Sequence, residues 1–339
     1  MSELAAAADT AADNAGRPQI PGSSRARQDS VRRYLSVYAV LFTFVVIFAF
    51  FSIERPTVFP TWDNTVAILN ASSVTMLIAA GLTPALIVND FDLSVASMAS
   101  LGSALVVVLT AQHGLSTPLA ILLVLLVAMI VGCINGALVV IHEGSSFILT
   151  LAVGSALTGL EFLLTGQKTI FTGIPHSLTD LGAQGIQSIV LPVLIAAVLA
   201  IALSAAVATT IFGRQLYAVG ANARAANVIG IRVARVKVTC MCISALLAAL
   251  AGIFISATTS NSYPSAGAPY LLPAFAAAFL GSTLFASRRF TPLGSALAAI
   301  LLQAVSTGLV EMNYSSWTIN AFDGLVLILA VTAAKSRRA

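Results

Sequence analysis

Apolar runs long enough to cross a membrane recur along nearly the whole chain, and this feature limits the folds open to it. A membrane-spanning helix takes about 20 consecutive apolar residues. Short polar segments separate ten such runs: 34–53, 66–88, 95–112, 117–141, 146–165, 188–212, 238–257, 271–286, 292–310 and 317–334. The sequence therefore predicts an all-α, polytopic integral membrane protein with about ten transmembrane helices.

The composition excludes the common soluble classes. Of the 339 residues, 58% are hydrophobic and only 9% are charged. Soluble globular domains carry about 25% charged residues. The chain has too little polar surface for a soluble enzyme or a nucleic-acid-binding domain.

The Lys and Arg residues indicate how the runs are oriented. Residues 1–33 contain no apolar run of the kind found in a signal peptide, and we expect a disordered cytoplasmic tail there. With ten spans over 34–334 and a second short tail at 335–339, fifteen of the 17 Lys and Arg residues fall on one side. Because cytoplasmic segments are enriched in Lys and Arg, both termini are predicted to be cytoplasmic.

The sequence shows no chemistry typical of an enzyme. It has no Gly-x-x-x-x-Gly-Lys-Ser/Thr motif, which would bind ATP, and its three His residues are scattered over different segments. Cys133, Cys240 and Cys242 lie in apolar runs and are interpreted as small buried hydrophobic residues. We expect no catalytic residues, no metal site and no cofactor within this chain.

The segment 213–237 is too polar to span a membrane. Ala223, Ala225, Ala226 and residues 228–231 recur at spacings that predict a short amphipathic helix, with Gly220 and Gly230 as its boundaries. A helix of small residues is suited to a groove on another protein. The alternative is a basic loop that lies on anionic lipid.

A few polar residues within or beside the apolar runs are candidates for function. Glu161 and Asp323 are carboxylates inside predicted spans, where ionisable groups are usually functional, although each could be an interfacial charge satisfied by water. Asp92 precedes the third run and could cap it by accepting N–H bonds at 94–95, or could act as a charge-dependent gate. Gly132 and Gly136 have the spacing that permits close approach of two helices.

Several motifs occur together and in the order found in one transporter family. The stretch from Tyr217 to Asn222 (Tyr-Ala-Val-Gly-Ala-Asn), with the later pairs Ala225-Ala226 and Gly230-Ile231, resembles the cytoplasmic coupling loop of ribose/xylose/galactose-type permeases of bacterial ABC importers. The stretch from Asp92 to Ser97 (Asp-Leu-Ser-Val-Ala-Ser) is similar to the motif after that family's second helix. Further matches are Gly132-x-x-Asn135-Gly136, 147–151, 164–166, 280–283 and Pro292-x-Gly294.

The resemblance covers roughly 35–335 and implies a type II-like ABC importer permease. Such a subunit would lie in the bacterial inner (plasma) membrane and carry a monosaccharide or related polyol. Its expected partners are a second permease, ABC ATPase subunits that bind ATP and Mg²⁺, and a periplasmic sugar-binding protein. The matching coupling residues are Asn222, Ala225, Ala226, Gly230 and Ile231, and the candidate pathway or gate residues are Asp92, Ser94, Ser97, Asn135, Glu161 and Asp323.

The sequence departs from the family pattern at several glycines. Asn89 and Asp90 stand where the family usually has two glycines, and Ala96 stands where it has another. These departures are compatible with a specialised half of a heterodimer, or with a homodimer from a divergent branch. The alternative function is a stand-alone ten-helix secondary transporter that uses Asp323 and Glu161 for ion coupling.

Overall fold

The computed structural model describes residues 42, 44–142, 145–284 and 289–335. Within them, seven helical segments are long and apolar enough to cross a membrane. They are α3 (Trp62–Ile87), α4 (Val95–Val107) continued by the π-helix η1 (Val108–Gln112), α5 (Thr117–Ile141), α6 (Ser146–Thr165), α8 (Leu191–Thr209), α11 (Val233–Thr259) and α13 (Pro292–Glu311).

The predicted count of ten spans is not confirmed. The other three predicted spans correspond to shorter apolar helices: Phe44–Glu54, the 3₁₀ turn η2 (Ala268–Tyr270) with α12 (Leu271–Leu284), and α14 (Ser316–Lys335). The predicted first span begins at 34, and its first part lies outside the described residues, as do both predicted tails apart from Lys335.

Two loops predicted to be polar contain short elements of their own. After α6 come α7 (His176–Ala183) and a hairpin of β1 (Gly185–Ile186) and β2 (Ile189–Val190), in which Gly185 pairs with Val190 and Ile186 with Ile189. After α8 come α9 (Ile211–Ala221) and α10 (Ala223–Val228). The predicted start of the sixth span at 188 was therefore too early, because the hairpin precedes α8.

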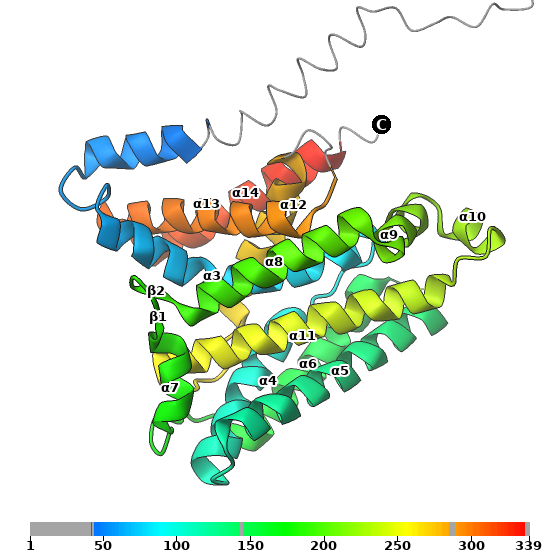
Figure 1. Cartoon of the computed structure of the whole chain (residues 1–339), viewed down its shortest axis with the longest axis horizontal. Coiled ribbons are helices and arrows are strands. Elements are labelled where there is room, and N and C mark those ends of the chain that lie inside the picture. The colour runs from blue at the N-terminus through cyan, green and yellow to red at the C-terminus, as the bar shows by residue number, and fades with distance from the viewer. Residues whose placement is uncertain (1–41, 43, 143–144, 285–288, 336–339) are drawn as a thin grey trace, which may run out of the picture.

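Successive long helices run back and forth between two ends of a helical bundle (Figure 1). One end, which we call the α7 end, carries α7, β1 and β2. The opposite end, which we call the α10 end, carries α9, α10, the first turn of α11 and the last turn of α14. This alternation positions the segment 88–94, between α3 and α4, towards the α10 end.

α11 is the central helix of the bundle and packs against α5, α4 and α3. α12 and α13 pack against α3 and against each other, and α14 packs against α12 and α13. The contact of α5 with α11 confirms the predicted close approach. A Cβ at Gly132 would lie 2.5 Å from the Cα of Cys242, and one at Gly136 would lie 2.6 Å from the Cα of Val238. The two backbones can approach this closely because neither glycine carries a side chain.

The outer helices expose apolar surface, as expected for a protein in lipid. α5, α6 and α8 leave many large apolar side chains exposed, whereas α3, α4 and α11 are mostly buried. Cys240 and Cys242 are buried as predicted, but the prediction was wrong for Cys133, which is exposed on α5. Its Sγ lies 3.5 Å from the Sγ of Cys242, beside the Gly132 contact.

Candidate functional site

The predicted coupling segment folds as two short helices rather than one. α9 ends at Ala221, and Asn222 then adopts an extended backbone and caps α10 by accepting the N–H of Ala225 at 3.0 Å. Gly230 follows the end of α10, at the boundary predicted for the short helix, and its φ of +88° lies in the left-handed region. Gly220 was wrongly predicted as a boundary, because it lies in the last turn of α9.

α10 presents a surface formed mostly by exposed residues. Asn222, Ala225 and Gly230 are exposed, and Ile231 is half-buried. Ala226, however, is only 3% exposed and packs into this chain's own core. Val228 and Ile229 were not among the coupling residues predicted from the sequence, yet their side chains are 86% and 75% exposed. Their place in the apolar run 228–231 was the available signal, but their exposure depends on how α10 packs.

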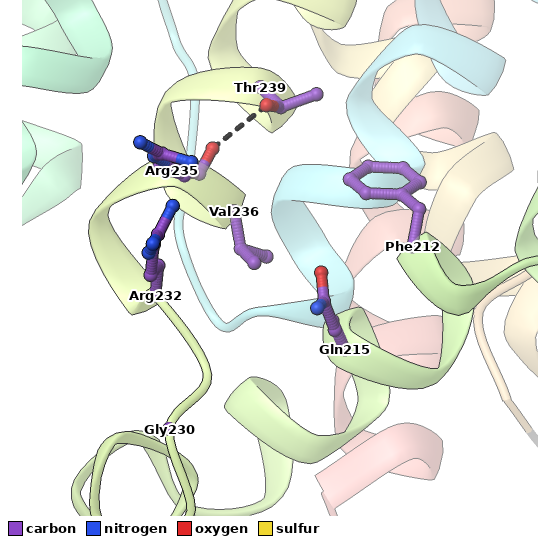
Figure 2. Close-up of a pocket in the computed structure, with 7 residues that line it drawn as sticks. All are labelled: Phe212, Gln215, Gly230, Arg232, Arg235, Val236 and Thr239. Atoms are coloured by element: carbon purple, nitrogen blue, oxygen red, sulfur yellow. Dashed lines mark hydrogen bonds between the residues drawn. The ribbon is translucent and has the colours of Figure 1, made fainter.

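A pocket of about 380 Å³ lies beside this segment, between α9 and the start of α11 (Figure 2). Arg232 and Arg235 carry positive charge on one side of it, and Phe212 and Val236 provide apolar surface. The hydroxyl of Thr239 donates to the carbonyl of Arg235 at 2.8 Å. Gln215 and Gly230 complete the lining. The pocket is therefore open to a group that is both anionic and partly apolar.

The interruption between α3 and α4, residues 88–94, is fixed by side chains from other helices. The Ser146 hydroxyl of α6 accepts the N–H of Phe91 at 2.9 Å, and the Thr150 hydroxyl accepts the N–H of Leu93 at 3.0 Å. Irregular backbone within a membrane protein needs such partners, because lipid offers none.

Asp92, Ser94 and Asn135 are brought together at the start of α4. Oδ1 of Asp92 accepts the Ser94 N–H at 3.0 Å and the Ser94 hydroxyl at 2.6 Å. The Asn135 side chain of α5 donates to the Ser94 hydroxyl at 2.7 Å. The bond predicted from Asp92 to the N–H of residue 94 is present, but it lies before the helix. Ser94 is itself the N-cap of α4, and no side-chain bond caps that helix. Burial raises the pKa of Asp92, and the Ser94 and Ser244 hydroxyls oppose that rise.

Ser97 and Glu161 each make contacts away from this cluster. The Thr158 hydroxyl of α6 donates to the Ser97 hydroxyl at 3.1 Å. Glu161 is fully buried and accepts the backbone N–H of Ser265 at 2.7 Å. That bond attaches α6 to the loop between α11 and η2, and the full burial of Glu161 does not fit an interfacial charge satisfied by water.

Asp323 lies apart from Glu161, in a cavity of about 350 Å³ formed by α3, η2, α12, α13 and α14. Asp323 is 6% exposed, and the same cavity contains several hydroxyl and amide side chains. They are Thr75, Tyr270, Gln303, Ser306, Thr307 and Asn320. This set can both donate and accept hydrogen bonds, which is the chemistry that a polyhydroxylated solute requires.

Comparison with known proteins identifies the family. The family model described as the permease component of the branched-chain amino acid transport system matches residues 64–331. This chain belongs to that family. The permease is 28% identical to the ribose import permease of Haemophilus influenzae, over 89% of this chain and 94% of the relative. It is 30% identical to the ribose import permease of Bacillus subtilis, over 92% and 95%.

A further relative is the autoinducer 2 import system permease of Photorhabdus luminescens, which is 30% identical over 77% of this permease and 78% of the relative. No solved structure matches the permease. The resemblance seen in the sequence motifs is thereby confirmed, and the chain is a multi-pass membrane protein of the sugar ABC importer permease family. A permease subunit of this kind is a transporter component and not an enzyme.

Proposed function

We propose that this permease is the transmembrane subunit of an ABC importer that carries a monosaccharide or a related polyol. A periplasmic binding protein delivers the solute, and a separate ATPase subunit binds ATP and Mg²⁺ and drives transport. The names of the relatives mention ribose and autoinducer 2. Both are small polyhydroxylated molecules, which supports this solute class.

In this proposal the α10 end faces the cytoplasm of a bacterial inner membrane. Five basic residues lie in the segment 213–237 at that end, whereas Arg55 and Lys168 adjoin helix termini at the α7 end. Positive charge marks the cytoplasmic side, and we propose that both chain termini are cytoplasmic as well. The binding protein docks on the opposite face, at the α7 end.

The observation that carries the proposal is the exposed apolar tip of α10, formed by Val228 and Ile229, at the basic end of the bundle. Exposed apolar residues on a polar segment favour a protein partner. Asn222, Ala225 and Gly230 share this exposed surface, and Ile231 supports it, so we assign these residues to the ATPase contact. Ala226 contributes by seating α10 on the permease.

The solute pathway in this proposal includes the cavity that Asp323 lines. Asp92, Ser94 and Asn135 hold the interruption that gates the inner part of the pathway, and Ser97 holds α4 against α6. Two permeases line the complete pathway, either as a homodimer or as a heterodimer. The membrane pathway binds its solute weakly, since selectivity belongs to the binding protein.

The test compares Val228→Asp with a matched control, Ile186→Asp, which alters a side chain 66% exposed in the β1–β2 hairpin at the other end. Tagged permease is purified in mild detergent, and co-purifying P-loop ATPase is quantified by mass spectrometry. Because a charge at the centre of an apolar contact removes its main anchor, we expect about tenfold less ATPase with Val228→Asp. Ile186→Asp should retain the full amount.

If Val228→Asp recovered as much ATPase as wild type, α10 would not be part of the ATPase contact. A wild-type permease that co-purifies with no ATPase and moves solute without ATP would instead support the stand-alone carrier. In that case Asp323 would be the first candidate for ion coupling.

A further inference from the structure

The segment 88–94 is bonded to both elements that flank α10. On one side, the Asn89 side chain donates to the backbone carbonyl of Gly220 in the last turn of α9, at 2.7 Å. On the other side, the Lys237 ammonium of α11 donates to Asp90 at 3.1 Å. α9 leads into α10, and α11 leads out of it. The interruption therefore contacts the chain immediately before and after α10.

Asn89 is suited to this contact by its backbone conformation. Its φ of +61° lies in the left-handed region, which Asn tolerates better than most residues with a side chain. The conformation follows directly on the end of α3 and brings the side-chain amide to Gly220. Gly220 in turn has no room for a Cβ, which would overlap the carbonyl oxygen of Ile87. The last turn of α9 is thus in direct backbone contact with the end of α3.

The Asp90–Lys237 ion pair makes the second contact. Lys237 Nζ lies 3.0 Å from Oδ2 of Asp90, and the Asp90 side chain is 8% exposed. It is the one ion pair among the residues that the structure describes. Burial raises the pKa of Asp90, while the Lys237 ammonium favours its charged form. Removal of either partner would leave the other charge poorly compensated in a nearly buried position.

The remainder of the segment transmits these contacts to the spanning helices. Phe91 and Leu93 are bonded to Ser146 and Thr150 of α6, and Ser94 is bonded to Asn135 of α5. A displacement of α9 or of the first turns of α11 therefore acts on the start of α4 through Asn89 and Asp90.

We propose that Asn89 and the Asp90–Lys237 pair are positioning residues that transmit movement of the α10 segment to the α3–α4 interruption. They touch neither ATP nor solute. They hold the interruption 88–94 to the elements that flank α10, so that the two move together. A shift of α10 then changes the arrangement of α3 and α4. This inference rests on the proposed function, because it presumes that an ATPase acts on α10.

The decisive substitution is Asn89→Gly, because glycine keeps the left-handed backbone and removes the side-chain amide that donates to Gly220. Asn89→Ala removes the bond and also strains the backbone. For the ion pair, Lys237→Gln removes the charge, Lys237→Arg retains it, and the exchange Asp90→Lys with Lys237→Asp restores opposite charges. Thr332→Val is the matched control, since it removes the hydroxyl bonds that Thr332 makes within α14, a helix that packs against α12 and α13.

The assembled complex of permease, ATPase and binding protein is reconstituted in liposomes, and solute moved per ATP hydrolysed is measured. We expect Asn89→Gly and Lys237→Gln to lower this ratio by about fivefold or more, the low end of typical coupling between sites. Assembly and basal ATP hydrolysis should match those of wild type. Lys237→Arg should recover most of the ratio, and Thr332→Val should leave it unchanged.

A ratio unchanged by Asn89→Gly and by Lys237→Gln would overturn the inference. Loss of assembly in both variants, with assembled wild type active, would also overturn it, because the residues would then be purely structural. A wild-type permease that assembles with no ATPase is a different result and contradicts the proposed function itself.

Discussion

Asp92 occupies a point where the backbone between two spans lacks helical hydrogen bonds of its own. Its Oδ1 accepts both the N–H and the hydroxyl of Ser94, and Asn135 adds a bond to the same hydroxyl. The local part of this arrangement could be predicted, since an Asp two residues before a Ser is typical of a helix start. The contribution of Asn135 could not, because it comes from another helix far along the chain.

The Asp92 contacts predict that its acceptor oxygen matters more than its charge. In Asp92→Asn the side-chain oxygen can still accept both bonds from Ser94, so we expect a change below about 1 kcal/mol in stability. In Asp92→Ala both bonds are lost, and we expect a cost of about 1–2 kcal/mol. Thermal unfolding of the purified permease in detergent measures both.

The Asp92 comparison separates the two interpretations given by the sequence. Equal destabilisation by Asp92→Asn and Asp92→Ala would show that the charge is required. Wild-type stability in Asp92→Asn with complete loss of transport would favour the gate.

At the scale of elements, glycines determine which helices can touch. Gly132 and Gly136 were predicted to permit close approach, and they bring α5 onto α11. Gly220 was predicted as a boundary of the short helix, but it allows close packing between α9 and the end of α3. The sequence does not distinguish these two uses of glycine, because the difference depends on a partner that only the folded chain brings near. The exposure of Cys133 was missed for the same reason.

The α5–α11 contact gives a matched pair of glycine substitutions. In Gly132→Ala the new Cβ would lie 2.5 Å from the Cα of Cys242, so the two helices must separate. We expect a loss of about 1–3 kcal/mol, the usual cost of overpacking. Gly159→Ala on α6 is the control, since its Cβ would meet no atom within 4 Å. Unfolding midpoints of the two variants measure the difference, and equal midpoints would show that the contact is not close-packed.

At the scale of the whole molecule, the positions of the apolar helices along the chain could be predicted, but their burial in the bundle could not. Within the described residues, the apolar runs correspond to the seven long helices and to three shorter ones, which the sequence had predicted as full spans. The apolar runs could not predict which helices lie inside the bundle and which face outward. α11 is central, whereas α5, α6 and α8 face outward. All of these helices have similar apolar sequences, and their burial depends on packing rather than on hydropathy.

The same arrangement relates the proposed sites to one another. The α10 surface and the 88–94 segment lie towards one end of the bundle, and the Asp323 cavity is bounded by α3, which leads into 88–94. A change at the α10 end can therefore reach the cavity through α3.

The most direct test of the central claim is solute uptake by liposomes that contain the permease with its co-purified ATPase and binding protein. Uptake is measured with ATP and Mg²⁺, with a non-hydrolysable ATP analogue, and with an ion gradient alone. The account predicts uptake of a monosaccharide or polyol only when ATP is hydrolysed. Uptake by the permease alone under an ion gradient, abolished by Asp323→Asn, would contradict the account and establish a secondary carrier.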